Sequence, residues 1–338
     1  PESTAHMYQL DIYVNDVARR KGKKLGYSLV DMLDRNLIGD GICDMISGVV
    51  GGPAGTNYGE NISTMAITKV FSVPVLVAAA IIAMVVSSLY NIVDQIFIGQ
   101  GVGYLGNAAT NVAYPLTTIC LSIALLIGIG GASQFSLSLG AGDKDAAQRA
   151  AGTAISMLAA AGVVYAVLIE IFLTPLMLAF GATGEVLPYA ESYTRITALG
   201  MPFLILTNGL SNLARADGSP RFSMTCMLLG AVINTILDPL FIFTFGMGIA
   251  GAAWATVIGQ VASCVMAASY IPRFQHIRLT RQSFGIPLRE AGRIASLGMS
   301  NSLNQLAITL VQIVLNNSLT YYGACLLYTS PSPRDPKT

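Results

Sequence analysis

The sequence predicts an all-α integral membrane protein. Only 11% of its residues are charged, whereas a soluble domain usually carries about 25%. Its mean hydropathy is +0.61, and its charges fall in short segments separated by long neutral stretches. The net charge of +1 provides no strong field for nucleic acid, so we expect no nucleic-acid partner. Membrane lipid is the expected environment, and a soluble enzyme is excluded.

The neutral stretches have the length of membrane spans. About 20 residues at a rise of about 1.5 Å per residue cross a hydrocarbon core of about 30 Å. Glycines and the turn signal Asp217–Pro220 separate the stretches. The predicted spans run from about 71 to 99, 107 to 139, 150 to 179, 190 to 213, 222 to 244, 249 to 272 and 294 to 321.

The loop charges predict the orientation of these spans. Lys144 and Arg149 follow the second span, Arg215 and Arg221 follow the fourth, and a basic segment at 273–293 follows the sixth. The opposite loops contain no Lys or Arg: 99–106, 181–187 and 245–248. Since Lys and Arg concentrate in cytoplasmic loops, the basic loops are predicted to face the cytoplasm. We expect a multi-pass protein of the cell membrane, in a bacterium the cytoplasmic membrane.

Two aspartates inside predicted spans point to a function. An aspartate at the centre of a span costs about 2.5–3.5 kcal/mol on insertion, so it normally serves a purpose. Counting from the loop ends places Asp94, Asp238 and Thr256 roughly 10 Å below the outer surface. Asn234 lies one turn below Asp238 on the same face. These four residues are predicted to hold a proton or Na⁺. The alternative is two unrelated aspartates that reach the interface.

Glu170 is the contrast to these aspartates. It lies in the third predicted span, near the outer interface, and is interpreted as having no part in the cation site.

The seventh predicted span carries a one-sided polar face. Asn301, Gln305, Gln312 and Asn316 fall within an arc of about 60° at 100° per residue. Such a face is typical of a water-filled cavity. It is equally typical of hydrogen bonding between packed helices, and the sequence does not separate the two.

Two further patterns receive structural interpretations. Gly101-Val-Gly103-Tyr-Leu-Gly106 matches the dinucleotide pattern, but that motif requires a preceding strand, so a turn between spans is predicted. Cys120, Cys226 and Cys264 lie in apolar runs without metal-ligand spacing, and we expect them to be buried like small apolar residues.

From about residue 86 to 324 the sequence resembles the multidrug and toxic compound extrusion (MATE) family. The resemblance is carried by Ser88–Gly99, Leu105–Asn111, Leu213–Pro220, Asn234–Pro239 and Gly248–Thr256. It implies the six-helix amino-terminal lobe of a MATE-type transporter, 86–272, with its first span shared with the preceding residues from about 71. It further implies a cytoplasmic inter-lobe linker at 273–293 and the first helix of a truncated second lobe at 294–324. The segment 325–338 resembles translated adaptor read-through.

The resemblance also implies a function. In that family an aspartate of the first span, an Asn and an Asp of the fifth and a Thr of the sixth form a cation site. They match Asp94, Asn234, Asp238 and Thr256. Family members are antiporters that import H⁺ or Na⁺ and expel amphipathic, often cationic, compounds. The chain is therefore expected to be a transporter rather than an enzyme, with H⁺ or Na⁺ as coupling ion and no other cofactor.

Residues 1–85 resemble a different family, the uracil/xanthine permeases that carry nucleobases together with a cation. This resemblance rests on the segments Pro1–His6, Asn36–Gly41 and Gly51–Asn61. Glu2 and Glu60 match two glutamates that contact the nucleobase in that family, and His6 lies in the same remnant. The Gly/Pro-interrupted segment suits a discontinuous helix; a solvated loop is the alternative.

The two resemblances meet within the first predicted span, at about Ala83–Ser88. They predict a chimera, which leaves a nucleobase symporter fragment or an inactive truncated chain as alternative functions. An intramembrane aspartyl protease would also use two aspartates. The contexts Ile-Val-Asp94-Gln and Ile-Leu-Asp238-Pro do not match the Tyr-Asp and Gly-x-Gly-Asp motifs of those proteases.

Overall fold

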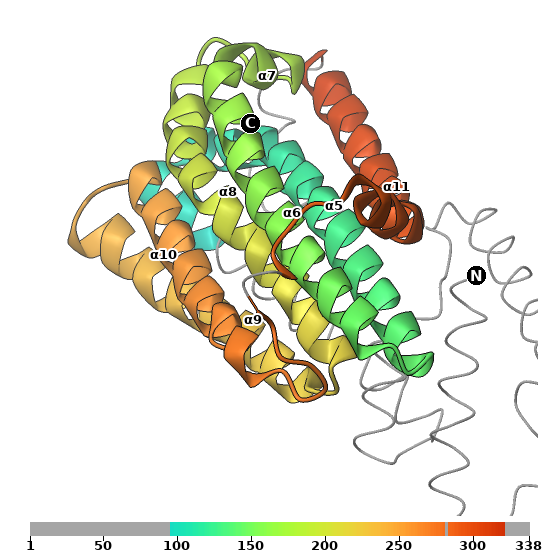
Figure 1. Cartoon of the computed structure of the whole chain (residues 1–338). Coiled ribbons are helices and arrows are strands. Elements are labelled where there is room, and N and C mark those ends of the chain that lie inside the picture. Colours follow the sequence, from blue (N-terminus) through green and yellow to red (C-terminus); the bar gives the residue numbers. More distant parts are fainter. Residues whose placement is uncertain (1–94, 281–282, 322–338) are drawn as a thin grey trace, which may run out of the picture. The chain divides into compact units, whose positions relative to one another are not determined.

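The computed structural model describes residues 95–280 and 283–321, which are mainly helical, with no strand among them (Figure 1). The chain divides into two units, residues 1–86 and 87–338, and all described residues belong to the second. The first predicted span up to residue 94, the permease-like remnant and the tail 325–338 lie outside the described residues.

Five of the described helical segments are long and apolar enough to cross a membrane. They comprise α5 (Tyr104–Gly140), α6 (Lys144–Ile171), α8 (Leu187–Ala216), α9 (Pro220–Pro239) with the π-helical turn Leu240–Thr244, and α10 (Ile249–Ala268). The second to sixth predicted spans are therefore confirmed. The other described helical segments include residues 95–102, the short α7 (Leu173–Ala179), a 3₁₀ turn at Ile271–Arg273, and α11 (Leu288–Tyr321).

The helices extend beyond the neutral stretches that predicted them. α6 begins at Lys144, because the side chain of Asp143 caps it by accepting a hydrogen bond from the Ala146 amide at 2.9 Å. Only the end of the third predicted span differs: it was predicted to be continuous to residue 179, but α6 ends at Ile171 and α7 begins after Phe172. α11 begins at Leu288, so residues 288–293 of the predicted linker are helical. Within the predicted turn at 99–106, only Gly103 is outside a helix, and its φ of 86° favours glycine.

The outer surface of the bundle is apolar. α6 exposes a row of large aliphatic side chains, namely Val163, Val164, Val167, Leu168 and Ile171. In water such a contiguous patch would be unusual. In lipid it is the expected surface of a spanning helix.

The centre of the bundle is α8, which packs against α5, α6, α9 and α10 (Figure 1). Small residues set these contacts: a Cβ atom on Gly128 of α5 would lie 2.9 Å from the Cα atom of Gly209 on α8. In lipid there is little hydrophobic force between helices, so close backbone approach and interhelical hydrogen bonds stabilise the packing.

α11 packs lengthwise on α5 through glycines and paired hydroxyl groups. A Cβ atom on Gly298 would overlap the backbone carbonyl of Leu126, so the two backbones touch there. Farther along, the hydroxyls of Ser122 and Ser302 lie 2.8 Å apart, and Thr309 donates to the Thr118 hydroxyl at 2.8 Å. The contact therefore requires small and polar residues in register.

The polar face of α11 contributes to the same contact. Pro115 has no N–H, so it leaves the Asn111 carbonyl of α5 without its helical partner. The Asn316 side chain donates to that carbonyl at 3.2 Å, and Gln312 donates to the Asn316 side-chain oxygen at 3.2 Å. For this part of the face, hydrogen bonding between helices is the interpretation that the structure supports. A cavity-lining role for Asn301 and Gln305 stays a prediction.

Candidate cation site

A close crossing of α9 and α10 positions the candidate site. A Cβ atom on Gly259 of α10 would lie 2.8 Å from the Gly230 carbonyl oxygen and 3.4 Å from the Asn234 Cβ atom on α9. One turn farther along α10, the Ser263 hydroxyl donates to the Cys226 carbonyl at 2.9 Å. The glycine pair therefore lets the two helices touch through their backbones, and polar side chains next to the crossing meet across it.

Asn234, Asp238 and Thr256 form one hydrogen-bonded cluster beside this crossing. The Asn234 amide group donates to Asp238 Oδ1 at 3.1 Å and to Thr256 Oγ1 at 3.4 Å. The Thr256 hydroxyl donates to the Ala252 carbonyl at 3.0 Å. Asn234 and Asp238 are 4% and 1% exposed. Because a buried carboxylate is costly without hydrogen bonds, the Asn234 amide stabilises Asp238 inside the bundle.

The regular α-helical geometry of α9 ends immediately after Asp238. Pro239 cannot donate to the carbonyl of Thr235, and α9 ends there. Residues Leu240–Thr244 continue as a π-helical turn. Such turns occur often at functional sites, so the buried carboxylate lies where the helix departs from regular geometry.

The structure brings three of the four predicted cation residues together; the fourth, Asp94, lies outside the described residues. So do Glu2, His6 and Glu60. The neighbour of Asp94 in the sequence, Gln95, is described, and its side chain donates to the Thr110 hydroxyl of α5 at 3.3 Å.

The remaining sequence predictions concern residues outside this cluster. Glu170 lies 3.8 Å from Arg195, and both side chains are well exposed, at 39% and 70%. This surface pair supports a structural interpretation. The three described cysteines are buried, as predicted. Among the described residues, no group of three His, Cys, Asp or Glu side chains could hold a metal ion.

A second buried carboxylate was missed in the sequence. Asp217, between α8 and α9, is 0% exposed. It accepts hydrogen bonds from the Tyr270 hydroxyl at 2.8 Å and from the backbone amides of Gln275 and His276 at 2.6 and 3.2 Å. Its Oδ1 atom also lies 2.9 Å from His276 Nδ1. The sequence indicates only a turn at Asp217-Gly218. Nothing in it indicates that the hydrogen-bond donors to Asp217 come from the residues that follow α10.

The glycine crossing predicts a stability contrast. Replacing Gly259 with Ala should lower the free energy of unfolding by about 1–2 kcal/mol, because the added methyl group meets the Gly230 backbone. Gly292 of α11 is the control, since a Cβ atom there has no atom within 4 Å. Gly292→Ala should leave stability unchanged or raise it by up to about 1 kcal/mol. Unfolding followed by circular dichroism in detergent measures both; equal changes would contradict the close crossing.

Two family models match the chain. The model described as MatE matches residues 79–240, and the model described as Permease family matches residues 2–98. The two matched ranges overlap in the stretch that contains the predicted junction.

Named relatives are exporters rather than enzymes. The chain is 31% identical over 259 residues to the multidrug export protein MepA of Staphylococcus saprophyticus subsp. saprophyticus, covering 75% of this chain and 55% of the relative. It is 28% identical over 254 residues to MepA of Staphylococcus aureus, with the same coverage. The chain thus spans about half the length of the curated relatives it matches.

Solved structures share the fold. An inward-facing multidrug resistance MATE family transporter of the MOP superfamily superimposes with a TM-score of 0.67 at 27% identity, covering 71% of this chain and 55% of that one. A MOP superfamily transporter from Pyrococcus furiosus superimposes with a TM-score of 0.62 at 28% identity, covering 67% and 50%. With the matching family model and the MepA relatives, these likenesses support a MATE family transporter for the helical part of the chain described here.

Proposed function

We propose that the described helices are one lobe of a cation-coupled exporter of amphipathic, often cationic, compounds. The observation that carries the proposal is the hydrogen-bonded cluster of Asn234, Asp238 and Thr256 between two membrane-length helices, in which Asn234 and Asp238 are buried. A carboxylate in this position is expensive to maintain, so it is expected to have a function. The MepA relatives are multidrug export proteins, which supports the same proposal.

The cluster has the chemistry to bind H⁺ or Na⁺. A carboxylate takes up a proton directly, and carboxylate, amide and hydroxyl oxygens are the ligands that hard cations prefer. On this proposal Asp94 supplies the second carboxylate. Either ion would neutralise Asp238, which removes the cost of a buried charge and changes the packing of α9 near its π-helical turn.

Coupling requires that the ion distinguish two conformations. An ion that bound both equally would shift nothing, however tightly it bound. We infer that the neutral cluster favours the conformation that releases the exported compound outward, so ion entry drives export. The proposed location is the bacterial cytoplasmic membrane, with the basic loops inside.

A two-lobe version of the chain tests this proposal. The part of the second lobe of the S. saprophyticus relative that follows its first helix would be joined after residue 321, and the protein reconstituted in vesicles loaded with a fluorescent cationic dye. An imposed H⁺ or Na⁺ gradient should accelerate dye export, and the effective gradient identifies the coupling ion. Export that continues unchanged after both gradients are collapsed would contradict coupling.

The Permease family match favours a second candidate for residues 2–98, a fragment of a nucleobase symporter. Uptake of labelled uracil by cells that express the chain would test it. The expected result for this candidate is uptake that disappears in Glu60→Gln.

A further inference from the structure

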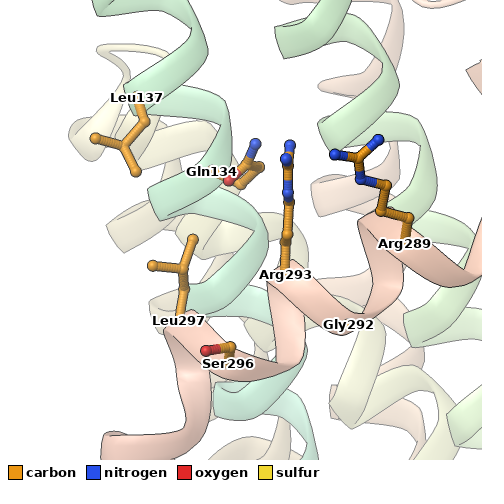
Figure 2. A pocket seen from close by; sticks show the side chains of 7 residues that line it. All are labelled: Gln134, Leu137, Arg289, Gly292, Arg293, Ser296 and Leu297. Carbon is orange, nitrogen blue, oxygen red and sulfur yellow. The ribbon is translucent and has the colours of Figure 1, made fainter.

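A wide-open cavity of about 490 Å³ lies between the end of α5 and the beginning of α11, and none of its lining residues belongs to the candidate cation site (Figure 2). Its lining joins basic, polar and apolar groups: Gln134, Leu137, Arg289, Gly292, Arg293, Ser296 and Leu297. Figure 2 shows both guanidinium groups rising from the same side of α11, with the Gln134 side chain beside Arg293.

The two arginines have no protein partner within the described ranges. Neither takes part in an ion pair or a side-chain hydrogen bond there. Glu290 lies between them in the sequence, yet it does not line the cavity. Two neighbouring positive charges repel each other, and guanidinium groups are suited to bidentate binding of phosphate. The cavity therefore presents two exposed guanidinium groups that are suited to binding an anion.

The walls of the cavity indicate which anion would bind. Leu137 and Leu297 are both exposed, at 58% and 37%, and they line the same cavity as the arginines. α5 is a membrane-length helix, and the arginines belong to the basic segment that the loop charges place on the cytoplasmic side. Basic pockets between spanning helices on that side suit anionic lipid headgroups.

We propose that this cavity binds the phosphate of an anionic membrane phospholipid. Arg289 and Arg293 contact the phosphate oxygens, Gln134 and Ser296 donate hydrogen bonds to the headgroup, and Leu137 and Leu297 contact the upper part of an acyl chain. Gly292 leaves the space open, because a Cβ atom there has no neighbour within 4 Å.

Lipid retention by the full chain tests the proposal. The purified protein would be supplied in neutral detergent with equal amounts of dioleoylphosphatidylglycerol and dioleoylphosphatidylcholine, and retained lipid measured by native mass spectrometry. The wild type should retain phosphatidylglycerol preferentially. Each basic side chain near an anionic lipid strengthens binding about fivefold, so Arg289→Gln with Arg293→Gln should weaken phosphatidylglycerol retention about 30-fold.

Two further variants separate the site from general charge and from folding. Arg273→Gln with Arg278→Gln removes two exposed arginines that do not line the cavity, and should retain lipid like the wild type. Gly292→Leu keeps both arginines but fills the space, and should lose the lipid while its circular dichroism melt is unchanged. Equal retention by wild type and Gly292→Leu would overturn the proposal. So would equal losses in both arginine pairs.

Discussion

Replacing Asp238 with Asn is expected to abolish ion-coupled export in the two-lobe version of this chain. Asn has the same shape and keeps an oxygen that accepts from Asn234, so the bundle should fold normally. The side chain is then permanently neutral, and the ion no longer distinguishes the two conformations at this site. Coupling free energies of about 1–3 kcal/mol correspond to factors of about 5–150. Gradient-driven dye export should therefore fall to the rate measured without a gradient.

Glu170 provides the matched control for this prediction. It is also a carboxylate on a membrane-length helix, but it lies at the surface near Arg195. Glu170→Gln should keep gradient-driven export near the wild-type rate, because a surface ion pair contributes about 1 kcal/mol or less. Full coupling in Asp238→Asn, or its loss in both variants, would contradict a specific role for the buried cluster.

Replacing Asp217 with Ala should produce the largest loss of stability in the described part of the chain. The carboxylate is completely buried and accepts hydrogen bonds from Tyr270, Gln275 and His276. Its removal leaves these donors without an acceptor and frees the segment that follows α10 from the turn between α8 and α9. We expect the free energy of unfolding to fall by about 3–5 kcal/mol.

Circular dichroism melts in detergent would measure this loss. Asp217→Asn keeps one acceptor oxygen but turns an N–H₂ group toward the same donors, so its stability should lie between that of Asp217→Ala and the wild type. Glu185→Ala removes an exposed carboxylate and should change stability by less than about 0.5 kcal/mol. If Asp217→Ala unfolded like Glu185→Ala, the hydrogen-bond network would contribute little.

The sequence was sufficient for features that depend on neighbouring residues. Neutral stretches of membrane length predicted the second to sixth spans, because a span must be long and apolar wherever it packs. Helical periodicity placed Asn234 and Asp238 on one face. Depth counted from the loop ends placed Thr256 beside them, and the hydrogen bonds of Asn234 connect all three. The exact helix ends were less predictable, since the Asp143 cap extends α6 into a charged segment.

Only the tertiary structure decided how the helices turn toward one another. In the sequence, the polar face of α11 was equally consistent with a cavity and with interhelical hydrogen bonds. In the structure, the Asn316 side chain donates a hydrogen bond to the α5 carbonyl that Pro115 leaves without a helical partner. The Gly230–Gly259 crossing and the partners of Asp217 were likewise not evident from the sequence. Local backbone geometry determines which residues share a helix face. The rotation of each helix about its own axis depends on packing against side chains that are distant in the sequence. It therefore cannot be predicted from local sequence patterns.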